Sequence, residues 1–264
     1  SVQNTKPLKN TDTADTLTAT WYSGADGDVH TEPGAPALPL YSVAVTPNDA
    51  DYILRGVGFR GGTFQDTANI TPLSGAPATE LQTTHTTFDS PVFYPNSMAK
   101  PNYWGLLTGG SQTSLLLTPA QHKATQPGTD YVLLRRYTNV DVRMFYINTT
   151  APGVRALAPV VFGVTSDAGT GMVSARVIGD DTNGAGIHSA WVTYTTSGSG
   201  VWQSLDLTRD TTDTAIWKAT RTLPAGTEYM VQAANSAGVV TVNDNLGAYY
   251  QWGVASSTLG ATRI

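Results

Sequence analysis

Four oxygen-bearing side chains are candidates for metal chemistry. Asp180, Asp181 and Asn183 fall within one predicted loop, and Asp244 follows the last predicted strand. Calcium takes roughly six to eight oxygen ligands from carboxylates, amides and carbonyls. These residues would therefore bind calcium if the two loops meet at one end of the fold, which the spacing leaves open. Because Asp, Asn and Gly also form turns without a ligand, the alternative is two ordinary turns and no cofactor.

Clustered aromatic residues are the candidates for ligand binding. They occur at residues 21–22, 103–104 and 249–252. Neighbouring residues of a strand point to opposite faces, so each group is expected to place one ring in the core and another at the surface. The candidate ligand-binding residues are Trp21, Tyr103, Trp104 and Trp252. An exposed ring can stack on a sugar, or it can seat a protein partner or a neighbouring module.

Local catalytic motifs are missing from the sequence. Residues 56–61 read G-x-G-x-x-G, but a dinucleotide site needs a helix directly after this motif and none is predicted. We expect a strand end and a turn there. None of the 4 histidines stands in an H-E-x-x-H motif, and no serine stands in G-x-S-x-G. We therefore expect a protein that is not an enzyme.

Composition narrows the classes of partner and the location. The net charge of −5 without a basic cluster disfavours nucleic acid. No apolar run approaches the roughly 20 residues of a spanning helix, so membrane insertion is not expected. Charged residues make up only 13%, cysteine is absent and threonine is abundant, which favours an extracellular or cell-surface protein. No secretion signal stands at Ser1, so we expect a processed or excised fragment.

Short alternating runs between turn residues predict an all-β fold of two β-sandwich domains in tandem. Residues 148–159 are small and contain two prolines, which is typical of a linker. We place the domains at residues 1–152 and 153–264. The first has strands separated by long loops and is expected to be jelly-roll-like or a large sandwich. The second has seven predicted strands between residues 160 and 242, followed by a Ser-, Thr- and Gly-rich tail.

One stretch of the second region carries a family resemblance. Leu223-Pro-Ala-Gly-Thr-Glu-Tyr229, followed by Val231, Ala233, Asn235 and Gly238, resembles the fibronectin type III signature. The region is also similar to immunoglobulin-like (Ig-like) modules of secreted bacterial proteins, on residues 185–194 and 201–207. The resemblance implies an Ig-like sandwich with the Tyr229 ring in its core and its hydroxyl capping a backbone group. It covers the C-terminal region alone.

Three functions follow as hypotheses. The first is a non-catalytic structural or adhesive module pair of a larger secreted or cell-surface protein. Its partners would be a protein or glycan at the cell surface, or neighbouring modules of the same polypeptide. The second is a carbohydrate- or substrate-binding accessory region of a secreted hydrolase. The third is a self-assembling surface or filament subunit, with residues 1–19 donated as a strand to a neighbouring sandwich.

Overall fold

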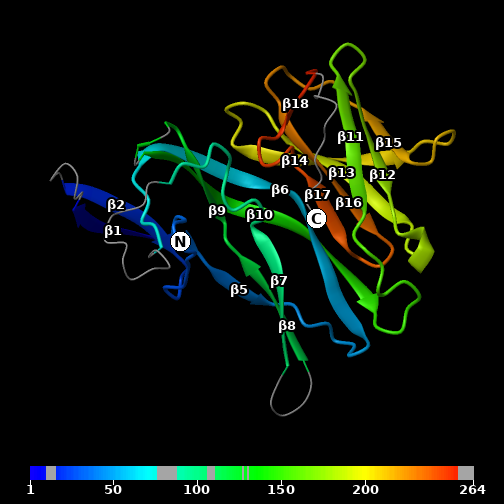
Figure 1. Ribbon diagram of the computed structural model, residues 1–264, viewed down its shortest axis with the longest axis horizontal. Coiled ribbons are helices and arrows are strands. Elements are labelled where there is room, and N and C mark those ends of the chain that lie inside the picture. Colours follow the sequence, from blue (N-terminus) through cyan, green and yellow to red (C-terminus); the bar gives the residue numbers. More distant parts are fainter. Residues whose placement is uncertain (10–15, 76–87, 106–110, 127, 130, 255–264) are drawn as a thin grey trace. The chain divides into compact units, whose positions relative to one another are not determined.

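A computed structural model describes residues 1–9, 16–75, 88–105, 111–126, 128–129 and 131–254 (Figure 1). Within these ranges the chain forms eighteen strands and a single 3-10 turn, Asp181–Asn183. The expectation of an all-β fold is confirmed. The strand-rich pattern follows from the sequence, in which β-branched and aromatic residues alternate with polar ones between turn-forming Gly, Pro and Asn.

The chain forms two compact units, each assembled from segments distant in sequence. Unit 1 comprises Ser1–Ala44, Phe64–Asn102 and Ser114–Thr138, and unit 2 comprises Val45–Thr63, Tyr103–Thr113 and Asn139–Ile264. Two long strands, β6 (Tyr52–Ile70) and β10 (Val132–Asn148), contribute residues to both units. The structure therefore divides the chain elsewhere than at residue 152. The segment expected to be a linker lies in unit 2, where Ala156 is buried against Ile147 and Ala185.

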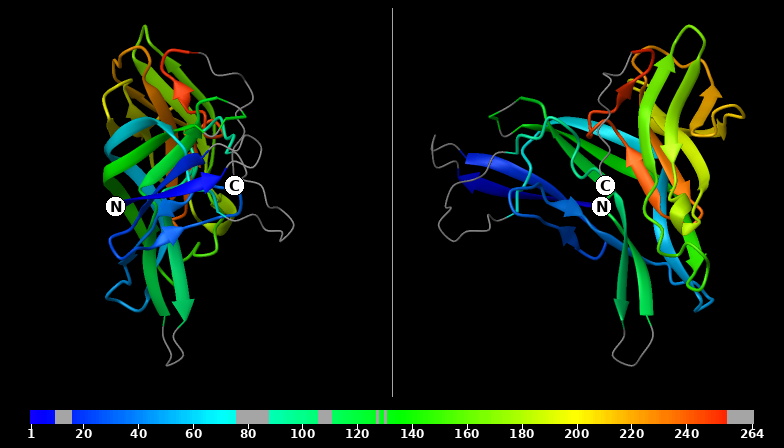
Figure 2. Two further views of the ribbon diagram at one scale, coloured as in Figure 1. Left: turned by 90° about the vertical axis from the view of Figure 1, so that its left-hand side faces the viewer. Right: turned by 45° about the vertical axis from the view of Figure 1, so that its right-hand side comes forward.

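The C-terminal part of unit 2 contains every strand predicted between residues 160 and 242. These strands are β11 (Val160–Asp167), β12 (Met172–Ile178), β13 (Ile187–Thr195), β14 (Val201–Arg209), β15 (Ile216–Thr220), β16 (Glu228–Asn235) and β17 (Val240–Asn243). Their order is β11-β12-β15-β14-β13-β16-β17, and all these pairs are antiparallel (Figures 1 and 2). The short strand β18 (Tyr250–Gln251) also pairs with β16.

Strands β13 and β16 are buried on both faces. Val192 and Val231 point into the main core, where they pack with Val173 of β12 and Trp217 of β15. The alternate residues of the same strands, including Trp191, Thr193 and Gln232, are also buried. A sheet with one face in water would expose these residues, so a further element must cover the second face.

Strand β6 covers that second face. Three side chains of β13 and β16 bind the Phe59 backbone: Trp191 Nε1 and Thr193 Oγ1 each donate to its carbonyl at 3.0 Å, and Gln232 both donates to the carbonyl (2.7 Å) and accepts from the N–H (2.9 Å). A Cβ at Gly58 would overlap the Trp191 ring. Residues 56–61 thus lie inside β6 and permit close packing, and the expectation of a strand end and turn is wrong.

Unit 1 contains smaller sheets. Strands β1 (Val2–Lys9) and β2 (Thr16–Ser23) form an antiparallel hairpin, and β3 (Val29–His30) pairs with β4 (Leu38–Pro39). Strand β9 (Ala120–Ala124) pairs with the first half of β10. Strands β5 (Tyr41–Ala44), β8 (Ser111–Leu117) and β7 (Ala99–Gly105) form a three-stranded sheet, in which residues 103–105 of β7 and 111–113 of β8 belong to unit 2 and the other residues to unit 1. The jelly-roll or large-sandwich arrangement of the first region stays a prediction.

A buried cation stabilises unit 1. The Arg135 guanidinium lies between the rings of Phe64 and Phe93, 4.0 and 4.2 Å from their centroids. It also makes two hydrogen bonds of 2.9 Å to the carboxylate of Asp66. A planar guanidinium can stack and form a bidentate pair at the same time. This arginine therefore has a structural role.

Candidate functional site

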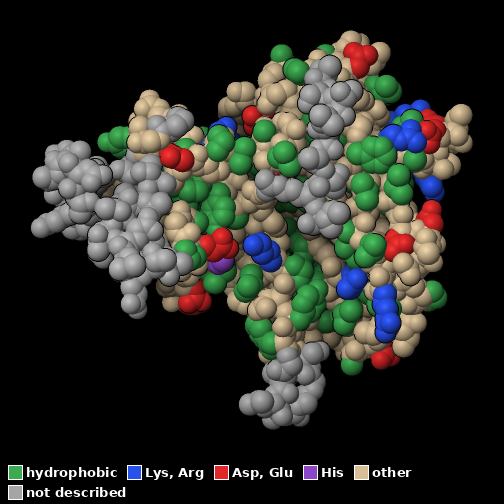
Figure 3. Space-filling model, viewed as in Figure 1, with side chains coloured by type: hydrophobic (Ala, Val, Ile, Leu, Met, Phe, Trp, Pro, Cys, Tyr) green, Lys and Arg blue, Asp and Glu red, His purple; other side chains and the backbone are tan. Residues whose placement is uncertain are grey.

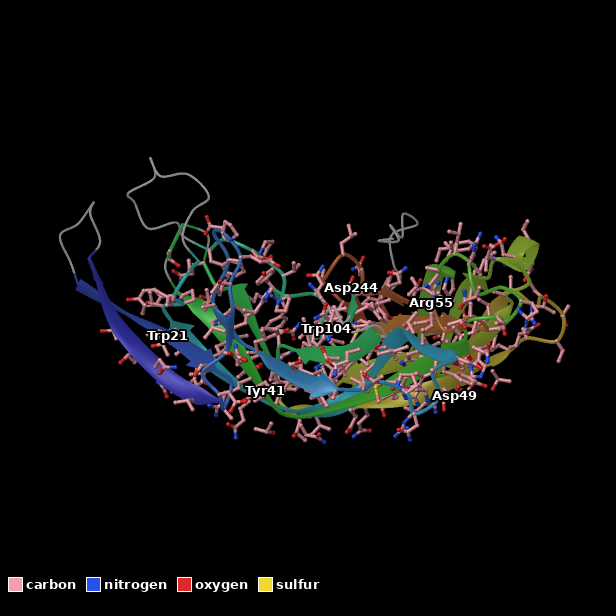
Figure 4. The ribbon with its side chains drawn as sticks, turned by 90° about the horizontal axis from the view of Figure 1, so that it is seen from below. Trp21, Tyr41, Asp49, Arg55, Trp104 and Asp244 are labelled. Carbon is pink, nitrogen blue, oxygen red and sulfur yellow. The ribbon has the colours of Figure 1, made fainter. Side chains whose placement is uncertain are left out.

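The β7–β8 hairpin carries an exposed and oriented tryptophan. Trp104 is 40% exposed, and its Nε1 donates a 2.9 Å hydrogen bond to Oε1 of Gln112 (Figure 4). This bond fixes the indole relative to the hairpin, because a tryptophan side chain has only two rotatable bonds. The expectation of a surface ring at this position agrees with the structure.

Tyr103 holds the same hairpin onto β6. Its hydroxyl donates to the backbone carbonyl of Leu54, and burial raises the pKa of the phenol above its ordinary value. The Tyr103 residue is nevertheless 51% exposed. A second link joins the hairpin to the chain before β6, because Val45 N donates to Thr113 O at 3.0 Å. These two attachments in unit 2 position Trp104.

A further exposed pair follows from the alternation in β10. Met144 and Tyr146 are each 37% exposed, and the Tyr146 hydroxyl donates to the Val45 carbonyl at 3.1 Å. The same Val45 residue binds Thr113 of the hairpin. Alternation along a strand puts Met144 and Tyr146 on one face, but it does not indicate whether that face is exposed. Sequence reasoning therefore missed them, along with Gln112.

The other two candidate tryptophans, Trp252 and Trp21, are less exposed than Trp104. Trp252 is 4% exposed, and its ring packs against Tyr229 at 5.8 Å in the main core of unit 2. The expectation of a ligand-binding ring there is wrong, because the segment 249–252 turns back onto β16 and buries its rings. Trp21 is half-buried on β2 in unit 1, next to the buried Tyr22.

The predicted oxygen donors of the 180–183 loop serve the backbone. Asp180 accepts hydrogen bonds from the N–H of Leu157 (2.9 Å) and from the Asn183 side chain (2.7 Å), and both bonds lower the pKa of its carboxyl. Asp181 lines a cavity of about 120 Å³ whose lining also includes the cation Arg209. Asp244 lies in the turn before β18, where its carbonyl accepts from Tyr249 N at 2.8 Å.

No metal cluster emerges from the described ranges. Within them, no three His, Cys, Asp or Glu side chains lie close enough to share a metal ion, so Asp180, Asp181 and Asp244 do not form such a group. His30 pairs with Glu32 at 3.1 Å, and Glu32 also accepts a 2.6 Å bond from the Tyr94 hydroxyl. This hydrogen bond lowers the pKa of Glu32, while burial raises that of Tyr94, so the phenol stays a donor.

The surface charge and the comparisons with known proteins do not identify a ligand or a reaction. Charged side chains are sparse on the face shown in Figure 3. None of the described segments is a helix with the length and apolar character needed to cross a membrane.

No family model and no curated protein matches the chain. Among solved structures, the complex of Porphyromonas gingivalis RgpB pro- and mature domains is similar at 14% identity and a TM-score of 0.39, over 56% of this chain and 75% of that one. This likeness carries no functional argument.

Proposed function

We propose that this protein is a non-catalytic structural and adhesive region of a larger secreted or cell-surface protein. The observation that carries the proposal is the exposed Trp104, held in one orientation by Gln112 on a hairpin that Tyr103 anchors to β6. A large ring held rigidly at a surface contributes contact area at a small cost in conformational entropy. Such a ring suits a binding role and supplies no acid, base or nucleophile.

The polar groups of unit 2 support a structural role. Gln232, Thr193 and Trp191 use their donors and acceptors to hold β6, and Asp180 holds the Leu157 backbone. Buried polar groups that are paired in this way rigidify a fold. They are also unavailable for catalysis, since their donors and acceptors are already engaged.

An Ig-like sandwich in the C-terminal region is part of this proposal. Its support is the strand order in unit 2, in which β12 lies between β11 and β15 and β13 lies between β14 and β16. The burial of Tyr229 agrees with the tyrosine position of that fold. Burial raises the pKa of the Tyr229 phenol to about 12, and the Ser166 side chain acts on it in the opposite direction. Modules of this kind are common in extracellular proteins, which favours that location.

Strand donation is a weaker candidate. Strand β1 pairs with β2 over its full length, from Val2–Ser23 to Lys9–Thr16. Donating residues 1–19 to another molecule would first require this hairpin to separate. Pro7 also lacks the N–H that a donated strand uses in pairing.

The test of the proposed function combines adhesion with activity. Beads coated with the full chain are expected to adhere to at least one member of a panel of neutral polysaccharides and extracellular matrix proteins, and uncoated beads are the control. The chain is also expected to leave fluorogenic ester, glycoside and peptide substrates unchanged. Turnover of any substrate that persists after repurification, or the absence of adhesion across the panel, would contradict the proposal.

A further inference from the structure

We propose that Trp104 is the stacking platform for a neutral pyranose ring, with the Gln112 amide as the hydrogen-bond donor beside it. The inference deepens the adhesive role proposed above and rests on it. Both residues belong to unit 2 and lie on the same hairpin. The proposal assigns a ligand class, neutral pyranoses, to this surface. It also selects Trp104 from the four aromatic candidates of the sequence as the stacking residue.

The bond between the two side chains determines which groups face a ligand. The indole N–H of Trp104 already donates to Gln112 Oε1 at 2.9 Å. The edge of the ring that carries its polar group is thus occupied, and the exposed part of the side chain is apolar and aromatic. The negative face of an aromatic ring attracts groups with partial positive charge, such as the polarised C–H bonds of a sugar.

The Gln112 amide supplies hydrogen-bond donors, which the face of the Trp104 ring lacks. Its oxygen is used by Trp104, whereas across the described residues no acceptor is bound to its NH₂ group. Gln112 is exposed, so these donors face solvent beside the indole. A sugar ring that stacks on Trp104 has its hydroxyl groups around its rim, above the edge of the indole at which this amide lies. A side-chain amide next to an aromatic face therefore matches both the C–H surface and the hydroxyl rim of a pyranose.

Charge favours a neutral sugar over an anionic ligand. The chain carries a net charge of −5, which opposes the approach of polyanions such as nucleic acids or sulfated glycans. β-Linked sugars with equatorial hydroxyls expose C–H bonds on both faces of each ring and fit a flat indole best. Tyr103 is not part of this platform, because the neighbouring residue of a strand points to the opposite face and its hydroxyl is bound to Leu54.

The test measures binding of β-linked oligosaccharides of glucose, N-acetylglucosamine and xylose to the full chain by titration calorimetry. The variant W104A is expected to weaken binding at least about tenfold. Q112E keeps an oxygen for the indole N–H but removes the NH₂ donors, and about a three- to tenfold loss is expected. The matched control is Y131A, which removes a ring that is 45% exposed in unit 1 and should leave binding unchanged.

The outcomes separate this inference from the proposed function. Loss of binding in W104A and Q112E, with Y131A unaffected, supports the sugar platform. Binding that survives W104A overturns it, and so does a chain that binds none of these sugars while its coated beads still adhere to matrix proteins. In both cases the adhesive role stands. Substrate turnover or a complete lack of bead adhesion would instead remove the proposed function itself.

Discussion

Acidification to pH 5 is expected to destabilise this protein through one buried histidine. His122 lies on β9 in unit 1 and is 2% exposed. Its backbone N–H and carbonyl both bond to Tyr94 at 2.8 Å, but neither ring nitrogen has a hydrogen-bond partner within the ranges described. Burial disfavours the charged imidazolium and lowers the pKa of His122 from 6.5 to about 3.

The sign and size of the effect follow from proton linkage. The unfolded chain takes up a proton at this residue as the pH falls through 6.5, whereas the folded chain stays neutral until about pH 3. Stability is therefore complete above pH 6.5 and is lost progressively below it. At pH 5 the loss is about 2 kcal/mol, or roughly a 30-fold change in the unfolding equilibrium. The pKa of Glu32 is lowered from 4.5, so Glu32 titrates below this window.

Urea unfolding followed by circular dichroism at pH 7 and pH 5 measures this loss. The variant H122L removes the titrating group and should be less sensitive to acid than wild type by about 2 kcal/mol. H188Q, which replaces an exposed histidine, is the matched control and should behave as wild type does. An NMR titration should also show no protonation of His122 between these two pH values. Equal acid sensitivity in wild type and H122L would show that His122 is not the group that destabilises the fold at pH 5.

Three further predictions concern packing and metal binding. G58A should lower the free energy of unfolding by about 1–3 kcal/mol, because the added Cβ overlaps the Trp191 ring; G186A, whose Cβ would meet only Asp181 Oδ1 at 3.8 Å, should cost less in the same urea titration. W252A should cost about 3–5 kcal/mol by leaving a cavity beside Tyr229, and a loss below 1 kcal/mol would contradict the core placement of this ring. Saturating calcium should leave the melting temperature unchanged, since Asp180 already serves the backbone; a site filled to 100 times its Kd would add about 2.7 kcal/mol and be readily seen by calorimetry.

Local sequence pattern was sufficient for the strands of the C-terminal region. Alternation along residues 187–196 and 228–234 places Val192 and Val231 on the same side of their strands as other core residues, and the structure has both strands there. The period of two is a property of the extended backbone itself. Strands can therefore be recognised in the sequence without knowledge of any tertiary contact. The all-β class follows for the same reason.

The candidate site depended on contacts that alternation does not encode. Trp104 and Trp252 stand in similar aromatic clusters, yet one is exposed on a hairpin and the other is buried against Tyr229. Alternation says which residues share a face, but not which face another part of the chain covers. The Gln112 bond that orients Trp104 also depends on the pairing of β7 with β8.

The glycines of residues 56–61 also show which conclusions the sequence allows and which require the tertiary structure. Their sequence excluded a dinucleotide site, because no helix follows them. Gly58, in contrast, is explained by Trp191, which is far away in the chain and whose ring a Cβ at this position would overlap. The sequence alone thus determined an all-β protein with few charges and without local catalytic motifs. Tertiary structure decided which faces are covered and which single tryptophan is held outward, because burial is set by distant segments.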